Sequence, residues 1–170
     1  MQLRNSLLAA GFLGAVSLYA ASACAKGTTA QDFVTKASIA NKFEIDSSKI
    51  AIRKSQNSDI KSFAQMMVDD HTKTGDKLKG VLDSSKSSFK PSDDLDDKHQ
   101  KLLDKLDAAS GNDFDNNYIS MQVDAHKEAV ELFGDYSKNG DDSKLKEFAG
   151  ETLPALKEHL RQVEKLKTSH

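Results

Sequence analysis

Four stretches of the chain, each about 25 residues long, repeat apolar residues at intervals of three and four. This spacing places apolar side chains on one face of an α-helix, whereas a half-buried strand would require strict alternation. The pattern therefore predicts an all-α protein built as a four-helix bundle. The first predicted helix runs from the capping-box pair Thr28 and Gln31 to "SQNS", and the second runs from Asn57 or Ser58 to "SSKSSFKPS". The third begins after "SGND" and ends at "SKNGDD", where the fourth begins and continues to Leu166.

A shorter periodic segment, residues 93–109, lies in the link between the second and third long helices. Ser92 and the acidic residues after it predict the start of this helix. At 1.5 Å per residue it would span roughly 25 Å, which is enough to run back along most of a bundle. We therefore predict a crossover between the second and third helices instead of four simple hairpins.

The first 25 residues have the pattern of a secretory signal peptide: a basic residue, Arg4, then an apolar run from Leu7 to Ala21, then small residues. Cleavage fits after Ala23 or Ala25, and Ala25 is favoured because basic Lys26 would then begin a polar mature end. Cys24 is discarded by that cleavage, although it is also a candidate lipid attachment site. We predict an exported, periplasmic protein, with lipid anchoring through Cys24 as the alternative.

The segment after the signal peptide, residues 26–170, is long enough for one domain with its own core. It carries 23 basic and 26 acidic residues with the two signs interspersed, and no basic stripe. Nucleic acid is therefore an unexpected partner, and no membrane span is expected in the mature chain. The sequence also lacks a nucleophile elbow, a phosphate loop and a zinc-protease helix motif.

Three histidines lie in the apolar stripes of three different predicted helices, and one glutamate lies in the stripe of the remaining helix. All four lie near the middle of their helices, so a bundle could bring them to one level whichever way each helix runs. They are Glu44, His71, His126 and His159. The other two histidines, His99 in the link and His170 at the end, are expected to be solvated.

Neutral imidazole and carboxylate groups suit zinc, iron, copper or manganese, so the four residues predict a site for one transition-metal ion. Three imidazoles could also hold the ion with an open position if Glu44 stayed outside the ligand set. The other interpretation is a structural polar network in which Glu44, Thr74, Thr152 or Ser47 satisfies the imidazoles. Gly75, one turn after His71, either permits a close helix approach or is simply tolerated.

Four segments in order resemble an exported bacterial ferritin-like family labelled domain of unknown function 4142: "FVTKASIANKFEIDSSKIA", "IKSFAQMMVDDHTK", "FDNNYISMQVDAHKEAVELF" and "LKEFAGETLPALKEHL". The resemblance implies a ferritin-like four-helix fold and a periplasmic or envelope location, without an activity. The recurring polar residues of the family fall on Glu44, Asp70, His71, His126 and His159.

This sequence departs from ferritin-like di-iron proteins, which place a Glu three residues before each of two histidines. The residues three before its histidines are Val68, Val123 and Leu156, so a di-iron centre is not expected. We expect a metal-handling or envelope-stress protein, or else a non-catalytic envelope protein that binds another protein. We expect a binding protein in preference to an enzyme, identify no catalytic residue, and expect no organic cofactor.

Overall fold

The computed structural model describes residues 27–169, with side chains described as far as Lys167. The predicted signal peptide, with Cys24, and His170 lie outside these residues. The described chain forms five helices: α1 (Ala30–Lys54), α2 (Ser58–Ser84), α3 (Asp97–Ala108), α4 (Gly111–Asn139) and α5 (Ser143–Ser169). The all-α prediction is therefore confirmed.

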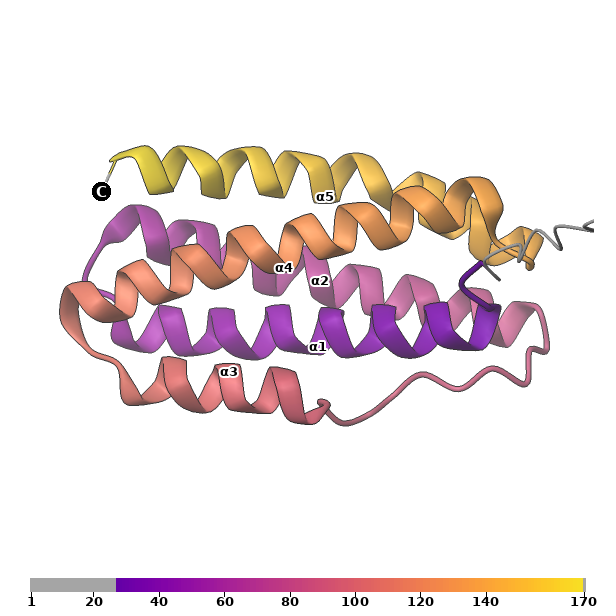
Figure 1. Ribbon diagram of the computed structural model, residues 1–170, viewed down its shortest axis with the longest axis horizontal. Helices are drawn as coiled ribbons and strands as arrows, with labels where there is room; N and C mark the ends of the chain where they lie inside the picture. Colours follow the sequence, from indigo (N-terminus) through magenta and orange to yellow (C-terminus); the bar gives the residue numbers. More distant parts are fainter. Residues whose placement is uncertain (1–26, 170) are drawn as a thin grey trace, which may run out of the picture.

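The four long helices pack as two antiparallel hairpins, α1 with α2 and α4 with α5 (Figure 1). Residues 85–96 leave the end of α2 and run back along the bundle to α3, which lies along α1 and ends where α4 begins (Figure 1). The link therefore returns the chain to the opposite end before the second hairpin starts. This confirms the predicted crossover and its short helix.

Side-chain caps set the starts of α1, α2 and α3, and two of these caps differ from the predicted ones. Asn57 accepts hydrogen bonds from the backbone of Asp59 and Ile60 and begins α2 as predicted. Helix α1 is capped by Thr29, one residue later than predicted, because the Thr29 hydroxyl accepts the bond from the Asp32 amide. Asp96 caps α3, so that helix begins four residues later than the Ser92 prediction placed it.

The link is held against α1 by three hydrogen bonds. The Gln31 amide side chain bonds both backbone groups of Lys90, donating to its carbonyl at 2.9 Å and accepting from its N–H at 3.1 Å. The Ser92 N–H donates to the Ser38 hydroxyl at 2.8 Å. These contacts fix residues 85–96 along one side of the groove between α1 and α2.

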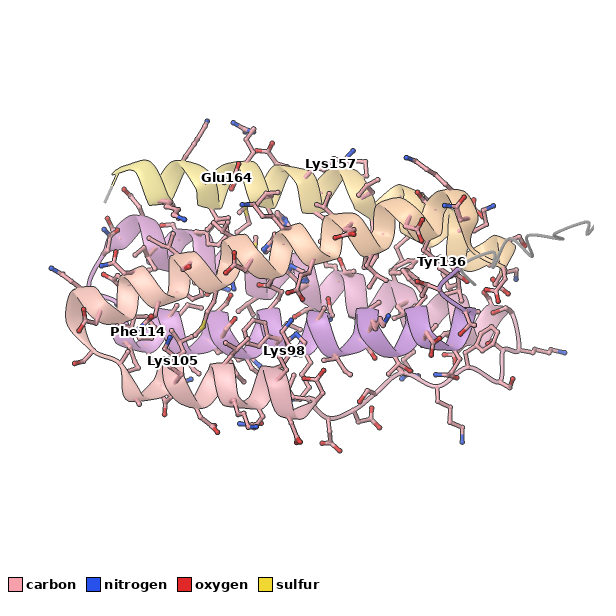
Figure 2. All side chains as sticks on the ribbon, viewed as in Figure 1. Lys98, Lys105, Phe114, Tyr136, Lys157 and Glu164 are labelled. Carbon is pink, nitrogen blue, oxygen red and sulfur yellow. The ribbon has the colours of Figure 1, made fainter. Side chains whose placement is uncertain are left out.

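The buried apolar residues form two separate clusters, one towards each end of the bundle. One contains Phe114 and the other contains Tyr136, and these two residues lie near opposite ends in Figure 2. The buried polar residues Glu44, His71, His126 and His159 belong to neither cluster. A polar layer therefore crosses the middle of the bundle between two apolar cores.

None of the helices in residues 27–169 combines the length and the apolar character needed to cross a membrane.

Candidate metal centre

Three imidazoles meet at the axis of the bundle, one each from α2, α4 and α5. The ring centroids of His71, His126 and His159 lie 5.5 to 5.7 Å apart, and each side chain is at most 5% exposed. One nitrogen of each ring can be chosen so that all three lie within 4.8 Å of one another. The structure therefore brings together the three histidines that lie in the apolar stripes of the predicted helices.

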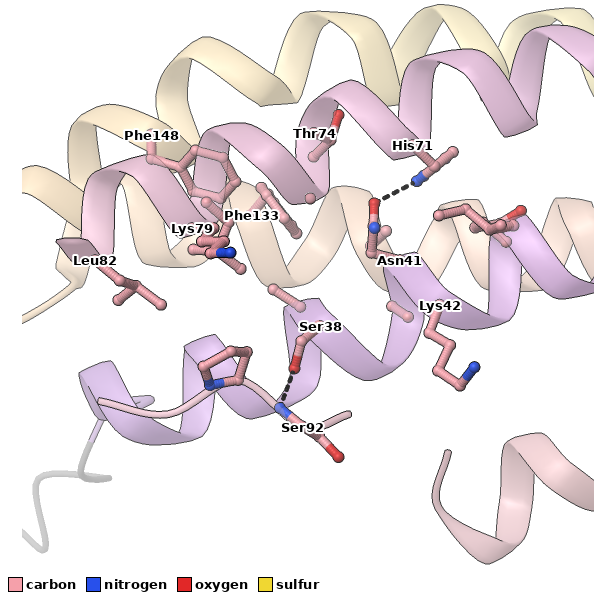
Figure 3. Close-up of a pocket in the computed structure, with 18 of the residues that line it drawn as sticks. Ser38, Asn41, Lys42, His71, Thr74, Lys79, Leu82, Ser92, Phe133 and Phe148 are labelled. Atoms are coloured by element: carbon pink, nitrogen blue, oxygen red, sulfur yellow. Dashed lines mark hydrogen bonds between the residues drawn. The ribbon is translucent and has the colours of Figure 1, made fainter. Parts of the chain in front are cut away.

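Each imidazole uses one nitrogen to contact an oxygen acceptor outside the triad. Nδ1 of His126 lies 2.9 Å from the Gln122 carbonyl, and Nε2 of His159 lies 3.2 Å from Oδ2 of Asp70. A carbonyl or a carboxylate can only accept, so both nitrogens must carry the proton. Nδ1 of His71 lies 3.1 Å from Oδ1 of Asn41 on α1 and donates in the same way (Figure 3).

The remaining nitrogen of each ring is buried and has no hydrogen-bond partner among the described residues. These atoms are Nε2 of His71, Nε2 of His126 and Nδ1 of His159. Because the other nitrogen donates, each of these atoms presents a lone pair. Such an arrangement, in which an outer oxygen fixes the tautomer of an imidazole, is typical of histidines that ligate metals.

Burial keeps the imidazoles neutral. It lowers the pKa of His126 to about 4. Burial, followed by repulsion from the other two imidazoles, lowers the pKa of His71 well below its usual value. Burial and His126 also lower the pKa of His159, although Asp70 opposes this shift. Neutral imidazole is the form that binds a metal, so the triad is in its ligating state at pH 7.

A single ion requires only a small contraction of this triad. Three ligands at about 2.1 Å from one ion in a trigonal arrangement lie about 3.6 Å apart. Equidistant nitrogens 4.8 Å apart would lie about 2.8 Å from their common centre, so each would move inward by about 0.7 Å or less. Rotations about the side-chain torsions can supply a shift of this size.

Glu44 is buried beside the triad but lies on its outer side. Its Oε1 is 3.5 Å from Nδ1 of His126, the nitrogen that bonds Gln122, and it is not in the group of three ligand atoms. Burial raises the pKa of Glu44 to about 8, so this contact joins two neutral groups at pH 7. This placement favours the alternative in which Glu44 stays outside the ligand set.

His99, expected in solvent, is instead partly buried against the bundle. Its ring meets Phe43 edge-on with centroids 5.1 Å apart, and its Nδ1 lies 2.6 Å from the Asp96 carboxylate. The expectation failed because α3 lies along α1, which covers one side of the ring. His99 does not belong to the triad.

The oxygen acceptors of the outer ring nitrogens were not predicted from the sequence. Asp70 was marked only by the family resemblance, and neither Asn41 nor the Gln122 carbonyl was singled out. Gln122 precedes His126 by one helical turn, a spacing that offers its carbonyl to the ring. Asn41 gives no such signal, because its contact with His71 depends on how α1 packs on α2.

The fold and the site together define a class of protein, a four-helix bundle with a buried histidine triad. The chain belongs to the family described as Domain of unknown function (DUF4142), whose model matches residues 16–166. No curated protein matched the sequence.

Several solved structures share the fold. A DUF305 fragment from Deinococcus radiodurans has a TM-score of 0.71 and 12% identity, covering 85% of this chain and 100% of the fragment. CopM in its Cu(II)-bound form has a TM-score of 0.70 and 17% identity, covering 85% of this chain and 99% of CopM. CopM has also been solved in a Cu(I)-bound form, at a TM-score of 0.67 and 18% identity, covering 83% of this chain and 96% of CopM.

A DUF305 protein from Streptomyces coelicolor has a TM-score of 0.67 and 14% identity, covering 82% of this chain and 92% of that protein. Its description provisionally calls it a secreted protein. At these identities the likenesses establish the fold alone.

Proposed function

We propose that this protein binds one transition-metal ion, with copper as the leading candidate. The ligands are the ring nitrogens that have no hydrogen-bond partner: Nε2 of His71, Nε2 of His126 and Nδ1 of His159. The protein would then handle metal in the cell envelope. Glu44, placed against the outer nitrogen of His126, helps to hold that ring and is not a ligand. The ion would bind to three neutral imidazoles and add a Lewis acid with an open coordination position.

Two observations together carry this proposal: each ring has one buried nitrogen that no described residue satisfies, and the three rings each bring one nitrogen within 4.8 Å of the others. An unsatisfied buried acceptor costs about 1–3 kcal/mol, so three of them require compensation. A water molecule has two protons and cannot donate to all three nitrogens at once. A single cation can bind all three, and it is the simplest species that stabilises the whole set.

The choice of copper rests on the ligands and on the similar proteins. Imidazole suits copper, zinc, iron and nickel, and copper(II) binds most tightly among divalent first-row metals. CopM, which shares the fold, has been solved with Cu(I) and with Cu(II). Zinc is the principal competitor, because three imidazoles and one open position also form a common zinc site.

An envelope location rests on the sequence before Lys26 and on the secreted description of one structural relative. Outside the cytoplasm a protein meets metal ions without the cytosolic thiol pool. Three histidines without a cysteine ligand suit such a compartment, because imidazole does not oxidise as a thiolate does.

Metal loading followed by elemental analysis tests the proposal. The protein is incubated separately with Cu²⁺, with Cu⁺ under a reductant, and with Zn²⁺, and then dialysed. We expect one equivalent of copper in the wild type, its loss in His126→Ala, and its retention in His99→Ala, which removes a histidine outside the triad. Equal copper contents in the three proteins would overturn the proposal.

The second candidate is a non-catalytic envelope interaction protein in which the imidazoles belong to a structural polar network. The hydrogen bonds around Glu44 favour it: Gln122 contacts Glu44 and donates to the Ser47 hydroxyl at 3.1 Å. In that case His126→Ala would lower stability to the same extent with and without metal, and no triad variant would change metal content.

A further inference from the structure

A cavity of about 860 Å³ leads from the surface to the triad. It lies between α1, α2 and residues 85–96, and its walls include the buried side chains Glu44, His71 and His126. Figure 3 shows Ser38 and Asn41 on α1 facing His71 and Thr74 on α2 across this space. The volume lies within the range of small-molecule sites and far exceeds that of an ion.

The inner end of the cavity reaches the bundle axis just beside the triad. Its walls there come from α2, α4 and α5 and include Leu78, Phe133, Phe148 and Leu156. Leu156 lies three residues before His159, so the cavity extends to the face of the triad that points towards the Tyr136 end of the bundle.

The opposite face of the triad is closed by the other apolar cluster. Met67, Val123 and Val163 each lie three or four residues from a triad histidine, and each is at most 2% exposed. An ion approaching from that end would have to cross a packed apolar core, where the cost of desolvation is prohibitive. Solution therefore reaches the triad most directly through the cavity.

Asn41 and Gly75 lie close together on the wall of the cavity. Both residues are half-buried and line the cavity. A Cβ atom at position 75 would lie only 3.0 Å from Nδ2 of Asn41, so the glycine leaves the room that the Asn41 side chain occupies. The same Asn41 side chain accepts the hydrogen bond from Nδ1 of His71. Gly75 therefore permits a close approach, one of the two roles considered for it.

We propose that this cavity is the route by which the ion enters and leaves the triad, with Asn41 and Gly75 forming its entrance. Asn41 is also the positioning residue for His71, because it accepts the hydrogen bond from Nδ1 of that ring. The residue that positions one ligand therefore also lies at the entrance of the route to that ligand. This inference rests on the proposed function, because it assigns a route to the ion that the triad binds.

Substitutions at two glycines of α2 test the route. Gly75→Ala and Gly75→Leu place progressively larger side chains at the entrance, and Gly80→Ala and Gly80→Leu place the same side chains where a Cβ meets nothing within 4 Å. Stopped-flow mixing with Cu²⁺, followed by tyrosine fluorescence, measures entry, and transfer of Cu²⁺ to excess chelator measures release. We expect Gly75→Leu to slow both rates about tenfold or more, because binding then requires the helices to separate.

Gly75→Ala should fall between the wild type and Gly75→Leu, and it provides the graded result if the leucine variant fails to fold. Asn41→Ala separates the two parts of the proposal: it widens the entrance, so entry is at least as fast as in the wild type, while release accelerates about tenfold or more because His71 also loses its acceptor. Equal rates in the position-75 and position-80 variants of a copper-binding protein would overturn the route. Failure of the wild type to bind copper would instead overturn the proposed function.

Discussion

Asp70 and His159 lie 89 positions apart in the chain and face each other between α2 and α5, with Oδ2 of Asp70 3.2 Å from Nε2 of His159. Asp70 immediately precedes His71, so two adjacent residues of α2 serve different imidazoles. His71 supplies its own ring, and Asp70 fixes the tautomer of the ring on α5. The sequence "DDH" therefore contributes to two of the three candidate ligands.

Removing the Asp70 carboxylate should weaken metal binding without unfolding the protein. Asp70→Ala leaves Nε2 of His159 without its acceptor, so the ring can rotate or change tautomer. Loss of such an outer partner typically lowers metal affinity about 10- to 100-fold. Competition with a chelator of known affinity measures the change. Asp69→Ala is the matched control, because Asp69 is exposed and bonds only Gln65 on its own helix in the described structure. Equal affinities in the two variants would contradict this role of Asp70.

Metal should raise the thermal stability of the wild type. A ligand that binds only the folded state at 100 times its Kd adds about 2.7 kcal/mol, which is about 5–10 °C in Tm for a domain of this size. Calorimetry with and without Cu²⁺ or Zn²⁺ measures the shift. We expect His126→Ala to lose the shift and His99→Ala to keep it. A shift that survives in His126→Ala would place the metal elsewhere.

Without metal, acid should destabilise the protein through the triad. The pKa of His126 is about 4 in the folded protein and 6.5 in the reference state, so the unfolded chain binds more protons between these values. Stability is therefore fully present above pH 6.5 and falls as the pH drops towards 4. His126 alone contributes a slope of up to about 1.4 kcal/mol per pH unit. Urea unfolding at several pH values tests this, and a flat profile over that window would refute it.

Glu44 should act in the opposite direction. Its pKa is about 8 in the folded protein and 4.5 in the reference state, so the folded chain binds more protons between these values. Its contribution to stability is present below pH 4.5 and is lost as the pH rises through 8. Together with the histidines, this predicts a stability maximum near pH 6.5 for the metal-free protein.

Glu44→Gln isolates that contribution, because the amide keeps the shape of the side chain without a titrating group. We expect this variant to lose the decline in stability between pH 6.5 and 8 and to show a steeper decline below pH 6.5. Its metal affinity should stay within a few-fold of the wild type, since Glu44 lies outside the three ligand atoms. Abolished metal binding in Glu44→Gln would show that the carboxylate is itself a ligand.

The helices and the level of the triad could be predicted because both depend on position along a helix. Periodicity gave the apolar face of each helix, and equal distances from the helix ends placed His71, His126 and His159 at one height. The crossover was predictable as well, since residues 93–109 are long enough to run back along the bundle. These features follow from the rise and period of the α-helix.

The chemical roles around the triad could not be predicted, because they depend on side-chain rotation and helix packing. Glu44 lies on the apolar line of α1, yet its carboxylate meets the outer nitrogen of His126. The position of Glu44 on the stripe did not indicate which nitrogen would face it. Asn41 became an outer acceptor only through the close approach at Gly75, which requires knowledge of how two helices pack.

The most direct test of a three-imidazole site is X-ray absorption spectroscopy of the copper-loaded protein. The fine structure reports the number and type of ligand atoms, and imidazole gives a characteristic multiple-scattering pattern. We expect one copper ion with three imidazole ligands in the wild type and fewer imidazole ligands in His71→Ala. A copper ion ligated by sulfur from a residue such as Met67, or by carboxylates with a spectrum unchanged in His71→Ala, would contradict it.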